Sequence, residues 1–177
     1  MILSALQDFV QRRRQDAAAD PVDADTVSAL VARIDAAAQV RLGRSLALWH
    51  ASAGGCNGCE LELRALDTVF YQLRRHGMRF VATPRHADVM LVTGPLTRNM
   101  AEAVERAWDA VPDPKWVVAL GDCAVDGGVF KGSYAVLGGV AVRLPVDLTI
   151  SGCPPPPARI LAGLRALLEA NATTDVR

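Results

Sequence analysis

Residues 115–123 read Lys-Trp-Val-Val-Ala-Leu-Gly-Asp-Cys, an apolar run that ends in a glycine, an aspartate and a cysteine. A run of this length, bounded by turn residues, predicts a buried β-strand over Lys115–Leu120. Cys123 then follows directly after the carboxyl end of that strand. The same order of strand, glycine and cysteine occurs twice more. The strands concerned are predicted over Ser45–His50, before Cys56 and Cys59, and over Val146–Ile150, before Cys153.

The rest of the chain from residue 45 onward alternates between short apolar runs and helical patterns. Two further strands are predicted, over Met78–Ala82 and Asp88–Val92. Apolar residues at helical spacing predict helices over Glu60–Arg75, Asn99–Ala110 and Pro157–Ala170. Because strands and helices alternate, we expect an α/β fold with a mostly parallel sheet flanked by helices. The stretch Asp122–Leu144 is rich in glycine and turn signals, which predicts a long ordered loop with a function.

The length of 177 residues fits a single domain with room for a modest additional segment. We expect residues 1–44 to form an N-terminal helical extension and residues 45–177 to form the main domain. In the extension, apolar residues recur at helical spacing over Met1–Gln15 and again after Pro21. The first of these helices is amphipathic, so it is predicted to pack on a partner, on a membrane surface or on its own domain.

Composition excludes several classes of function. The formal net charge is zero, so neither a nucleic-acid-binding surface nor a polybasic membrane patch is expected. No apolar run approaches the ~20 residues that a membrane-spanning helix needs. The arginines at 12–14 are not followed by an apolar stretch, so no export signal is predicted. We therefore expect the chain on the cytoplasmic side, where cysteines more often bind metals or act as catalytic thiols than form disulfides.

The four cysteines are expected to meet at one edge of the sheet. The carboxyl ends of parallel strands share an edge, and ligands bind at that edge. Each cysteine also stands close to a glycine, which permits tight turns and close approach of the backbone. Glycine leaves backbone amides free to donate hydrogen bonds to the sulfurs of an iron–sulfur cluster. The residues predicted to converge are Cys56, Cys59, Cys123 and Cys153.

Four converging thiols are compatible with one 4Fe-4S cluster, with one structural zinc ion, or with unligated or redox-switching thiols. Structural zinc usually takes cysteines in two close pairs, whereas Cys123 and Cys153 are unpaired and separated by a strand and a loop. The spacing therefore favours the cluster. The three histidines, His50, His76 and His86, are scattered and are predicted to be packing residues. There is no phosphate-binding loop and no nucleophile elbow, so no chemistry on an organic substrate is expected.

Four motifs resemble one known family. They are Gly54-Gly55-Cys56-Asn57-Gly58-Cys59-Glu60, Gly94-Pro95-Leu96-Thr97, Gly121-Asp122-Cys123 and Gly152-Cys153-Pro154-Pro155. The family comprises the small subunits of membrane-bound, energy-conserving nickel-iron hydrogenases of the formate hydrogenlyase type, together with the 20 kDa subunit of respiratory complex I. The resemblance extends from about Leu46 to Leu168 and leaves residues 1–44 uncovered.

The resemblance implies a flavodoxin-like domain in which the four cysteines hold one 4Fe-4S cluster, the one nearest the active site of the complex. It implies electron transfer between a large subunit, with a nickel-iron or quinone site, and a ferredoxin-like subunit, and indirect attachment to membrane subunits. Glu60 matches an acidic position near a proton path, although a carboxylate at a helix N-terminus needs no such role. Residues of the remaining loop at the same edge would touch the partner or the cluster: Thr93, Gly94, Pro95, Thr97 and Arg98.

The spacing of the first two cysteines separates the branches of the family. Complex I subunits carry two adjacent cysteines where this chain has Cys56-Asn57-Gly58-Cys59. The spaced pair resembles the hydrogenase branch. A quinone reductase subunit of the complex I type remains the alternative, and a zinc-stabilised interaction module is a second one.

Overall fold

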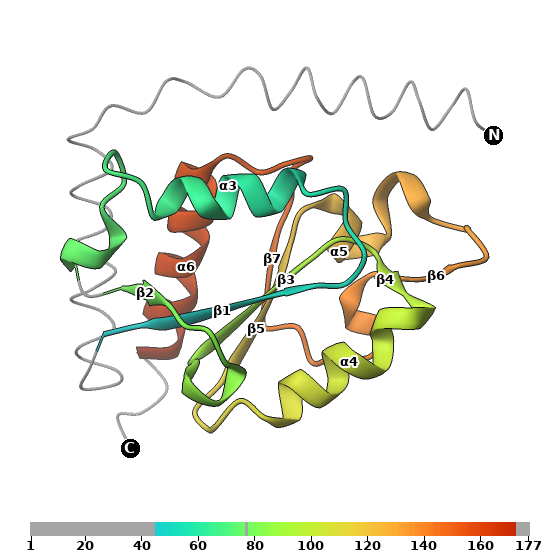
Figure 1. Cartoon of the computed structure of the whole chain (residues 1–177), viewed down its shortest axis with the longest axis horizontal. Coiled ribbons are helices and arrows are strands. Elements are labelled where there is room, and N and C mark those ends of the chain that lie inside the picture. Colours follow the sequence, from blue (N-terminus) through green and yellow to red (C-terminus); the bar gives the residue numbers. More distant parts are fainter. Residues whose placement is uncertain (1–44, 77, 173–177) are drawn as a thin grey trace.

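The computed structural model describes residues 45–76 and 78–172. The predicted N-terminal extension, residues 1–44, lies outside the described residues. The centre of the fold is a five-stranded sheet in which all neighbouring strands are parallel (Figure 1). Its order is β2-β1-β3-β5-β7, formed by β1 (Ala47–Ser52), β2 (Arg79–Phe80), β3 (Val89–Thr93), β5 (Trp116–Leu120) and β7 (Leu148–Ile150).

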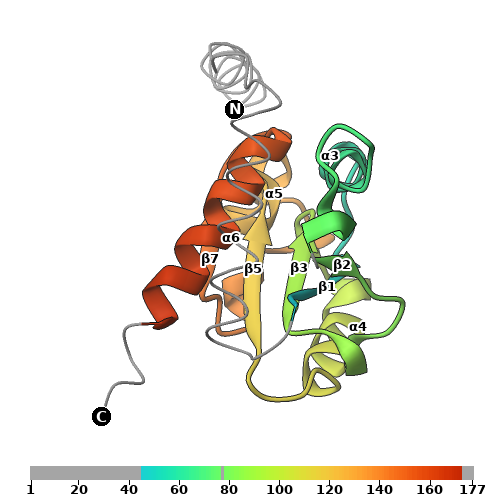
Figure 2. The ribbon, with the colours of Figure 1, turned by 90° about the vertical axis from the view of Figure 1, so that its left-hand side faces the viewer.

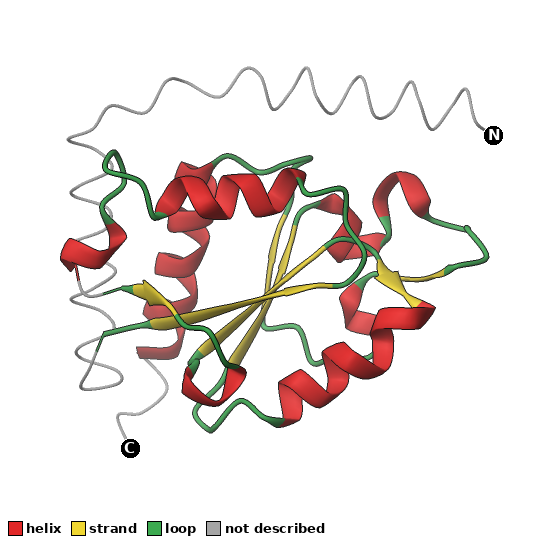
Figure 3. Ribbon diagram, viewed as in Figure 1, coloured by secondary structure: helices red, strands yellow, loops and turns green. Residues whose placement is uncertain are grey.

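Counted along the chain, these parallel strands have the order 2-1-3-4-5, which is the flavodoxin-like arrangement. Helices lie on both faces of the sheet (Figures 2 and 3). The α/β prediction is thus confirmed. The helices are α3 (Gly58–Leu66), α4 (Arg98–Asp109), α5 (Asp122–Asp126) and α6 (Pro157–Ala172). Within the described ranges, no helix has the length and apolar character needed to cross a membrane.

Shorter elements complete the fold. A second, two-stranded antiparallel sheet pairs β4 (Leu96–Thr97) with β6 (Val136–Gly138). Four single-turn 3₁₀-helices occur in the described residues, over Leu73–His76, Pro84–His86, Gly128–Phe130 and Val140–Val142.

Alternate residues of the central strands pack into two separate hydrophobic cores. Val89 and Leu91 of β3 face the core that includes α3 and α6, while Met90 and Val92 face the core that includes α4 and α5. All five residues of β3 and all five of β5 are buried. This explains why both strands are continuous apolar runs rather than alternating ones, as parallel strands covered on both faces usually are.

The strand register aligns the carboxyl ends of four strands. Ser52 of β1 pairs with Thr93 of β3, Thr93 with Leu120 of β5, and Leu120 with Ile150 of β7. Each of these residues is the last of its strand. The four loops that follow therefore begin side by side at one level of the same edge.

Aspartates form hydrogen bonds that connect the strands at their opposite, amino-terminal ends. The buried Asp88 carboxylate accepts the Ala47 N–H at 2.8 Å, which ties the beginning of β3 to that of β1. The Asp147 carboxylate accepts the Val117 N–H at 2.7 Å, and the Asp147 N–H donates to the Val117 carbonyl at 3.0 Å. This reciprocal pair of bonds joins β5 to the residue just before β7.

Two predicted elements have wrong bounds. The helix predicted over Glu60–Arg75 ends at Leu66, because the Thr68 hydroxyl donates to the Ala65 carbonyl at 2.6 Å and competes with the next helical turn. The first strand begins and ends two residues later than predicted, at Ala47–Ser52.

The prediction of a loop over Asp122–Leu144 also needs correction. It contains α5, two 3₁₀ turns and β6, and β6 pairs with the unpredicted β4. Elements of three to five residues are too short to show a period in the sequence. The other predicted elements differ from the observed ones only near their ends.

Candidate metal centre

The four cysteines lie in the segments that follow β1, β5 and β7: Cys56 and Cys153 are on loops, Cys59 is in the first turn of α3, and Cys123 is in α5. Cys56 is exposed, the other three are half-buried, and all are free thiols. They are close enough for the charges of Cys123, Cys153 and Cys56 to act on Cys59, and for those of Cys153 and Cys56 to act on Cys123. The structure thus brings all four to one place. Among the described residues, no group of three or more His, Cys, Asp or Glu side chains is set to hold a single metal ion.

The surroundings of the thiols disfavour their charged form. Burial raises the pKa of Cys59 to about 12, and the charges of Glu60 and the other three thiols act in the same direction. Burial, followed by Cys153 and Cys56, raises the pKa of Cys123 to about 11, against a hydrogen bond from the Val129 backbone. A nucleophilic or redox-active thiol needs a lowered pKa, whereas the pKa values of Cys59 and Cys123 are raised. A bound metal centre would instead deprotonate the thiols directly.

Glycines let the backbone lie close to two of the sulfurs. A Cβ atom on Gly121 would lie 2.6 Å from the Cys59 sulfur, and one on Gly128 would lie 2.9 Å from the Cys123 sulfur. Both glycines also have left-handed φ angles, +88° and +51°. At these two positions a side chain larger than hydrogen would collide with the sulfur. An all-thiolate donor set with backbone amides close by is suited to an iron–sulfur cluster.

The loop after β3 packs against the loop that carries Cys56. A Cβ on Gly94 would lie 2.4 Å from the Gly55 nitrogen, so the two backbones are in contact. The Thr97 hydroxyl donates to the Ala53 carbonyl at 2.9 Å, and the Ala53 N–H donates to the Thr93 carbonyl at 2.8 Å. This contact lies between β1 and β3, where the strand order reverses and where ligands of such sheets usually bind.

Two other residues of this loop differ in their surroundings. Pro95 is buried, and the exposed Arg98 donates from its Nε to the Tyr134 carbonyl at 2.7 Å. Of the five residues singled out in this loop, Thr93, Gly94 and Thr97 are the ones that touch the loop leading to Cys56.

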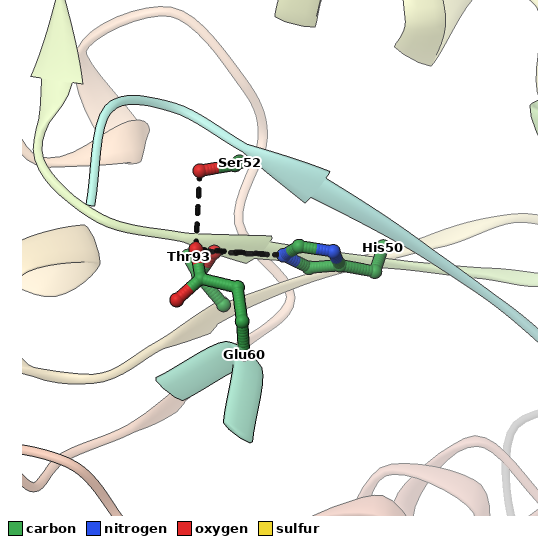
Figure 4. Close-up of polar contacts among 4 residues, drawn as sticks. All are labelled: His50, Ser52, Glu60 and Thr93. Atoms are coloured by element: carbon green, nitrogen blue, oxygen red, sulfur yellow. Dashed lines mark hydrogen bonds and ion pairs between the residues drawn. The ribbon is translucent and has the colours of Figure 1, made fainter. Parts of the chain in front are cut away.

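Glu60, in the first turn of α3, is the centre of a polar network (Figure 4). Its Oε1 accepts hydrogen bonds from the Thr93 hydroxyl at 2.8 Å and from the Ser52 hydroxyl at 3.1 Å. The Thr93 Oγ1 lies 2.8 Å from His50 Nε2, and His50 Nε2 is 3.9 Å from the carboxylate. The strand ends of β1 and β3 thus hold the carboxylate that follows Cys59 in sequence.

The network defines the protonation of its members. Burial alone would raise the pKa of Glu60, but hydrogen bonds from Thr93, its own backbone and Ser52, with the charge of His50, bring it below the usual range. Glu60 is therefore a carboxylate near neutral pH and the Thr93 hydroxyl donates to it. Because a hydroxyl has one hydrogen, Thr93 must accept from His50, which places the proton of the neutral imidazole on Nε2.

An open cavity of about 440 Å³ borders the network, lined by His50, Glu60, Leu63, Arg64, Asp67 and Phe80. His50 was predicted to be a packing residue, and this is where sequence reasoning missed a site residue. A signal was present, because His50 and Ser52 are two apart on a strand and so point to the same face. That face is the one on which α3 and Glu60 lie.

The described part of the chain is thus a flavodoxin-like α/β domain with four thiols at the carboxyl edge of its parallel sheet. A family model described as "NADH ubiquinone oxidoreductase, 20 Kd subunit" matches residues 56–167, a span that contains all four cysteines. The chain belongs to this family, which confirms the resemblance inferred from the motifs.

Two relatives are named as a formate hydrogenlyase subunit and a probable membrane-bound hydrogenase subunit. The chain is 41% identical over 143 residues to formate hydrogenlyase subunit 7 of Escherichia coli (strain K12), covering 81% of this chain and 56% of the relative. It thus spans little more than half the length of that relative. It is 42% identical over 131 residues to the probable membrane-bound hydrogenase subunit mbhJ of Pyrococcus furiosus, covering 74% and 78% respectively.

A solved structure shares the fold. It is a chain of the membrane-bound sulfane sulfur reductase, an archaeal respiratory membrane complex, with a TM-score of 0.66 and 29% identity. The match covers 81% of this chain and 77% of the other.

The close contact at Gly94 yields a first prediction. Gly94→Ala places a Cβ against the Gly55 backbone, whereas Gly132→Ala, at a similar φ of +84°, meets nothing within 4 Å. Left-handed strain should cost both variants about 1–2 kcal/mol of unfolding free energy. Gly94→Ala should lose a further ~1–3 kcal/mol through overpacking. Denaturant titration of both variants measures the difference, and equal losses would contradict the close contact.

His50 yields a pH prediction. Burial lowers its pKa below the ordinary value of 6.5, with Glu60 opposing and Arg64 assisting. The folded chain then binds fewer protons than the unfolded chain just below pH 6.5. Stability is therefore complete above that pH and falls as the pH drops through 6.5 toward the folded pKa.

The comparison is between the wild type and His50→Gln, which keeps an N–H donor for Thr93 but does not titrate. We expect the thermal midpoint of the wild type to fall more steeply than that of the variant between about pH 7 and about pH 5. Parallel profiles would show that His50 has an unshifted pKa.

Proposed function

We propose that this chain is an iron–sulfur electron-transfer subunit in which Cys56, Cys59, Cys123 and Cys153 hold one 4Fe-4S cluster. The observation that carries the proposal is the single row of strand ends, because three of its four loops deliver thiols to one place. Membership of the 20 kDa subunit family supports it. When bound, such a cluster accepts and passes on one electron at a time.

The protein's own residues supply position and environment. Binding to positively charged irons would offset the burial and the mutual repulsion that raise the pKa values of Cys59 and Cys123. The glycines at 121 and 128 keep side chains away from two of the sulfurs. Hydrogen bonds to the sulfurs and the degree of solvent exposure are the means by which such a domain adjusts the reduction potential.

We further propose that the partner is a large subunit with a nickel-iron site, and that a ferredoxin-like subunit exchanges electrons with the cluster. The relatives named formate hydrogenlyase subunit 7 and membrane-bound hydrogenase subunit mbhJ support this, as does the spaced pair Cys56 and Cys59. The exposed Val129 and Phe130, close after Cys123, suit a surface that a partner covers. The complex would then carry this chain peripherally, on the cytoplasmic side of its membrane.

The alternative is a partner without nickel. The family also contains the 20 kDa subunit of NADH ubiquinone oxidoreductase, and a solved relative belongs to a sulfane sulfur reductase. In either case the cluster assignment would stand and the large subunit would differ.

We also propose that Glu60 lies near a proton path. Its carboxylate is joined through Thr93 to His50, and both His50 and Glu60 border the open cavity. This continuous chain of hydrogen-bonding groups connects the residue beside Cys59 with solvent.

The cluster assignment predicts that Cys123→Ala loses the paramagnetic signal of the reduced cluster and lowers iron below the about four atoms per chain of a 4Fe-4S centre. Val125→Ala, in the same short helix, trims a half-buried side chain without removing a thiol and serves as the control. Electron paramagnetic resonance and iron analysis of the intact complex provide the measurement. An unchanged signal and iron content in Cys123→Ala would refute the assignment.

The nature of the partner is tested by measuring iron, nickel and zinc together in the purified intact complex, alongside hydrogen-dependent dye reduction. We expect iron and nickel with hydrogen activity. Full iron without nickel or hydrogen activity would overturn the hydrogenase assignment and leave the cluster. About one zinc per chain without iron would instead establish the zinc-stabilised module.

A further inference from the structure

Strands β5 and β7 are joined by the same pattern of bonds at both ends. At the amino-terminal end, Asp147 and Val117 exchange two hydrogen bonds. At the carboxyl end, the Asp122 N–H donates to the Gly152 carbonyl at 2.9 Å, and the Gly152 N–H donates to the Asp122 Oδ1, also at 2.9 Å. In each pair an aspartate supplies one backbone and one side-chain bond.

The carboxyl-end pair has a special position in the chain. Asp122 directly precedes Cys123, and Gly152 directly precedes Cys153. The bonds therefore join the two residues from which two of the proposed ligands extend. One step earlier, the Gly121 N–H donates to the Ile150 carbonyl at 2.8 Å, which continues the strand pairing up to this point.

The Asp122 side chain has no counterpart on the other loop. Gly152 has a φ of +143°, and a Cβ there would lie 2.7 Å from the Pro155 Cα, so this position excludes a side chain that could form the link. Removing the Asp122 carboxylate would leave only the backbone bond to the Gly152 carbonyl. The Gly152 N–H would lose its acceptor, and the Cys153 loop would gain freedom to turn.

We propose that Asp122 is a positioning residue that sets Cys123 and Cys153 at the separation the cluster requires. This rests on the proposed function, since it presumes that the two thiols share a cluster. Asp122 acts through the Gly152 N–H and does not itself bind iron. Its carboxylate also acts electrostatically on Cys123, so a purely electrostatic role has to be separated from a geometric one.

Three variants of the intact, purified complex separate these roles. Asp122→Ala removes the acceptor and the charge, whereas Asp122→Asn removes the charge but keeps a carbonyl oxygen for the Gly152 N–H. Asp147→Ala removes the equivalent bond from the same two strands at the edge without cysteines. The readouts are the rate of iron release to a chelator and the shape of the paramagnetic signal of the reduced cluster.

Loss of one such hydrogen bond should accelerate iron release about tenfold in Asp122→Ala, with an altered signal. Asp122→Asn should release iron at close to the wild-type rate with a wild-type line shape. Asp147→Ala should also leave both readouts near those of the wild type. This combination would establish positioning through the Gly152 N–H.

Other outcomes would overturn the inference. Equal behaviour of Asp122→Ala and Asp147→Ala would show that the bond contributes only to the general stability of the domain. Equally fast iron release in both Asp122 variants would show that the charge of Asp122 matters instead. If Asp122→Ala fails to assemble, Asp122→Asn decides alone: normal iron retention supports positioning and rapid loss opposes it. A wild-type complex without iron would overturn the proposed function as well, whereas an iron-loaded wild type with an unaffected Asp122→Ala overturns only the inference.

Discussion

The parallel pairing of four strands in one register is the constraint on which the site depends. Because Ser52, Thr93, Leu120 and Ile150 stand in a row, the loops that follow begin together although they are far apart in sequence. Each strand contributes little alone, since β7 has three residues. Burial of both faces of β3 and β5 holds the row, and aspartates at the amino-terminal ends keep the strands from sliding.

The edge is closed by two sets of contacts with different physical origins. Between β1 and β3 the backbones of Gly55 and Gly94 touch, which only residues without side chains permit. Between β5 and β7 the link is the Asp122 carboxylate on the Gly152 N–H. Gly121 lies against the Cys59 sulfur and so connects the two halves. Backbone contacts therefore position these segments, and Cys59 also packs against the hydrophobic core that includes α3 and α6.

Such an arrangement has an electrostatic cost that a bound cluster would remove. Burial, together with the charges of the neighbouring thiols, raises the pKa values of Cys59 and Cys123, so these two thiols are neutral in the metal-free site. Glu60, one residue from Cys59, shows the opposite behaviour: three hydrogen-bonding partners favour its charged form despite burial. A carboxylate and two thiols with raised pKa values thus lie close together at this edge of the sheet.

The sequence by itself determined the α/β class, the parallel sheet and the convergence of the four cysteines at one edge of that sheet. It did so because apolar runs, glycines and cysteines follow one another in a repeated order that depends on local chemistry. Short elements such as α5 and β6 could not be predicted, since three to five residues carry no period. Only the tertiary structure decided that His50 and Thr93 hold Glu60 and that Asp122 meets Gly152. These contacts join residues 30 to 43 positions apart, and strand register, which no local pattern encodes, brings them within hydrogen-bonding distance.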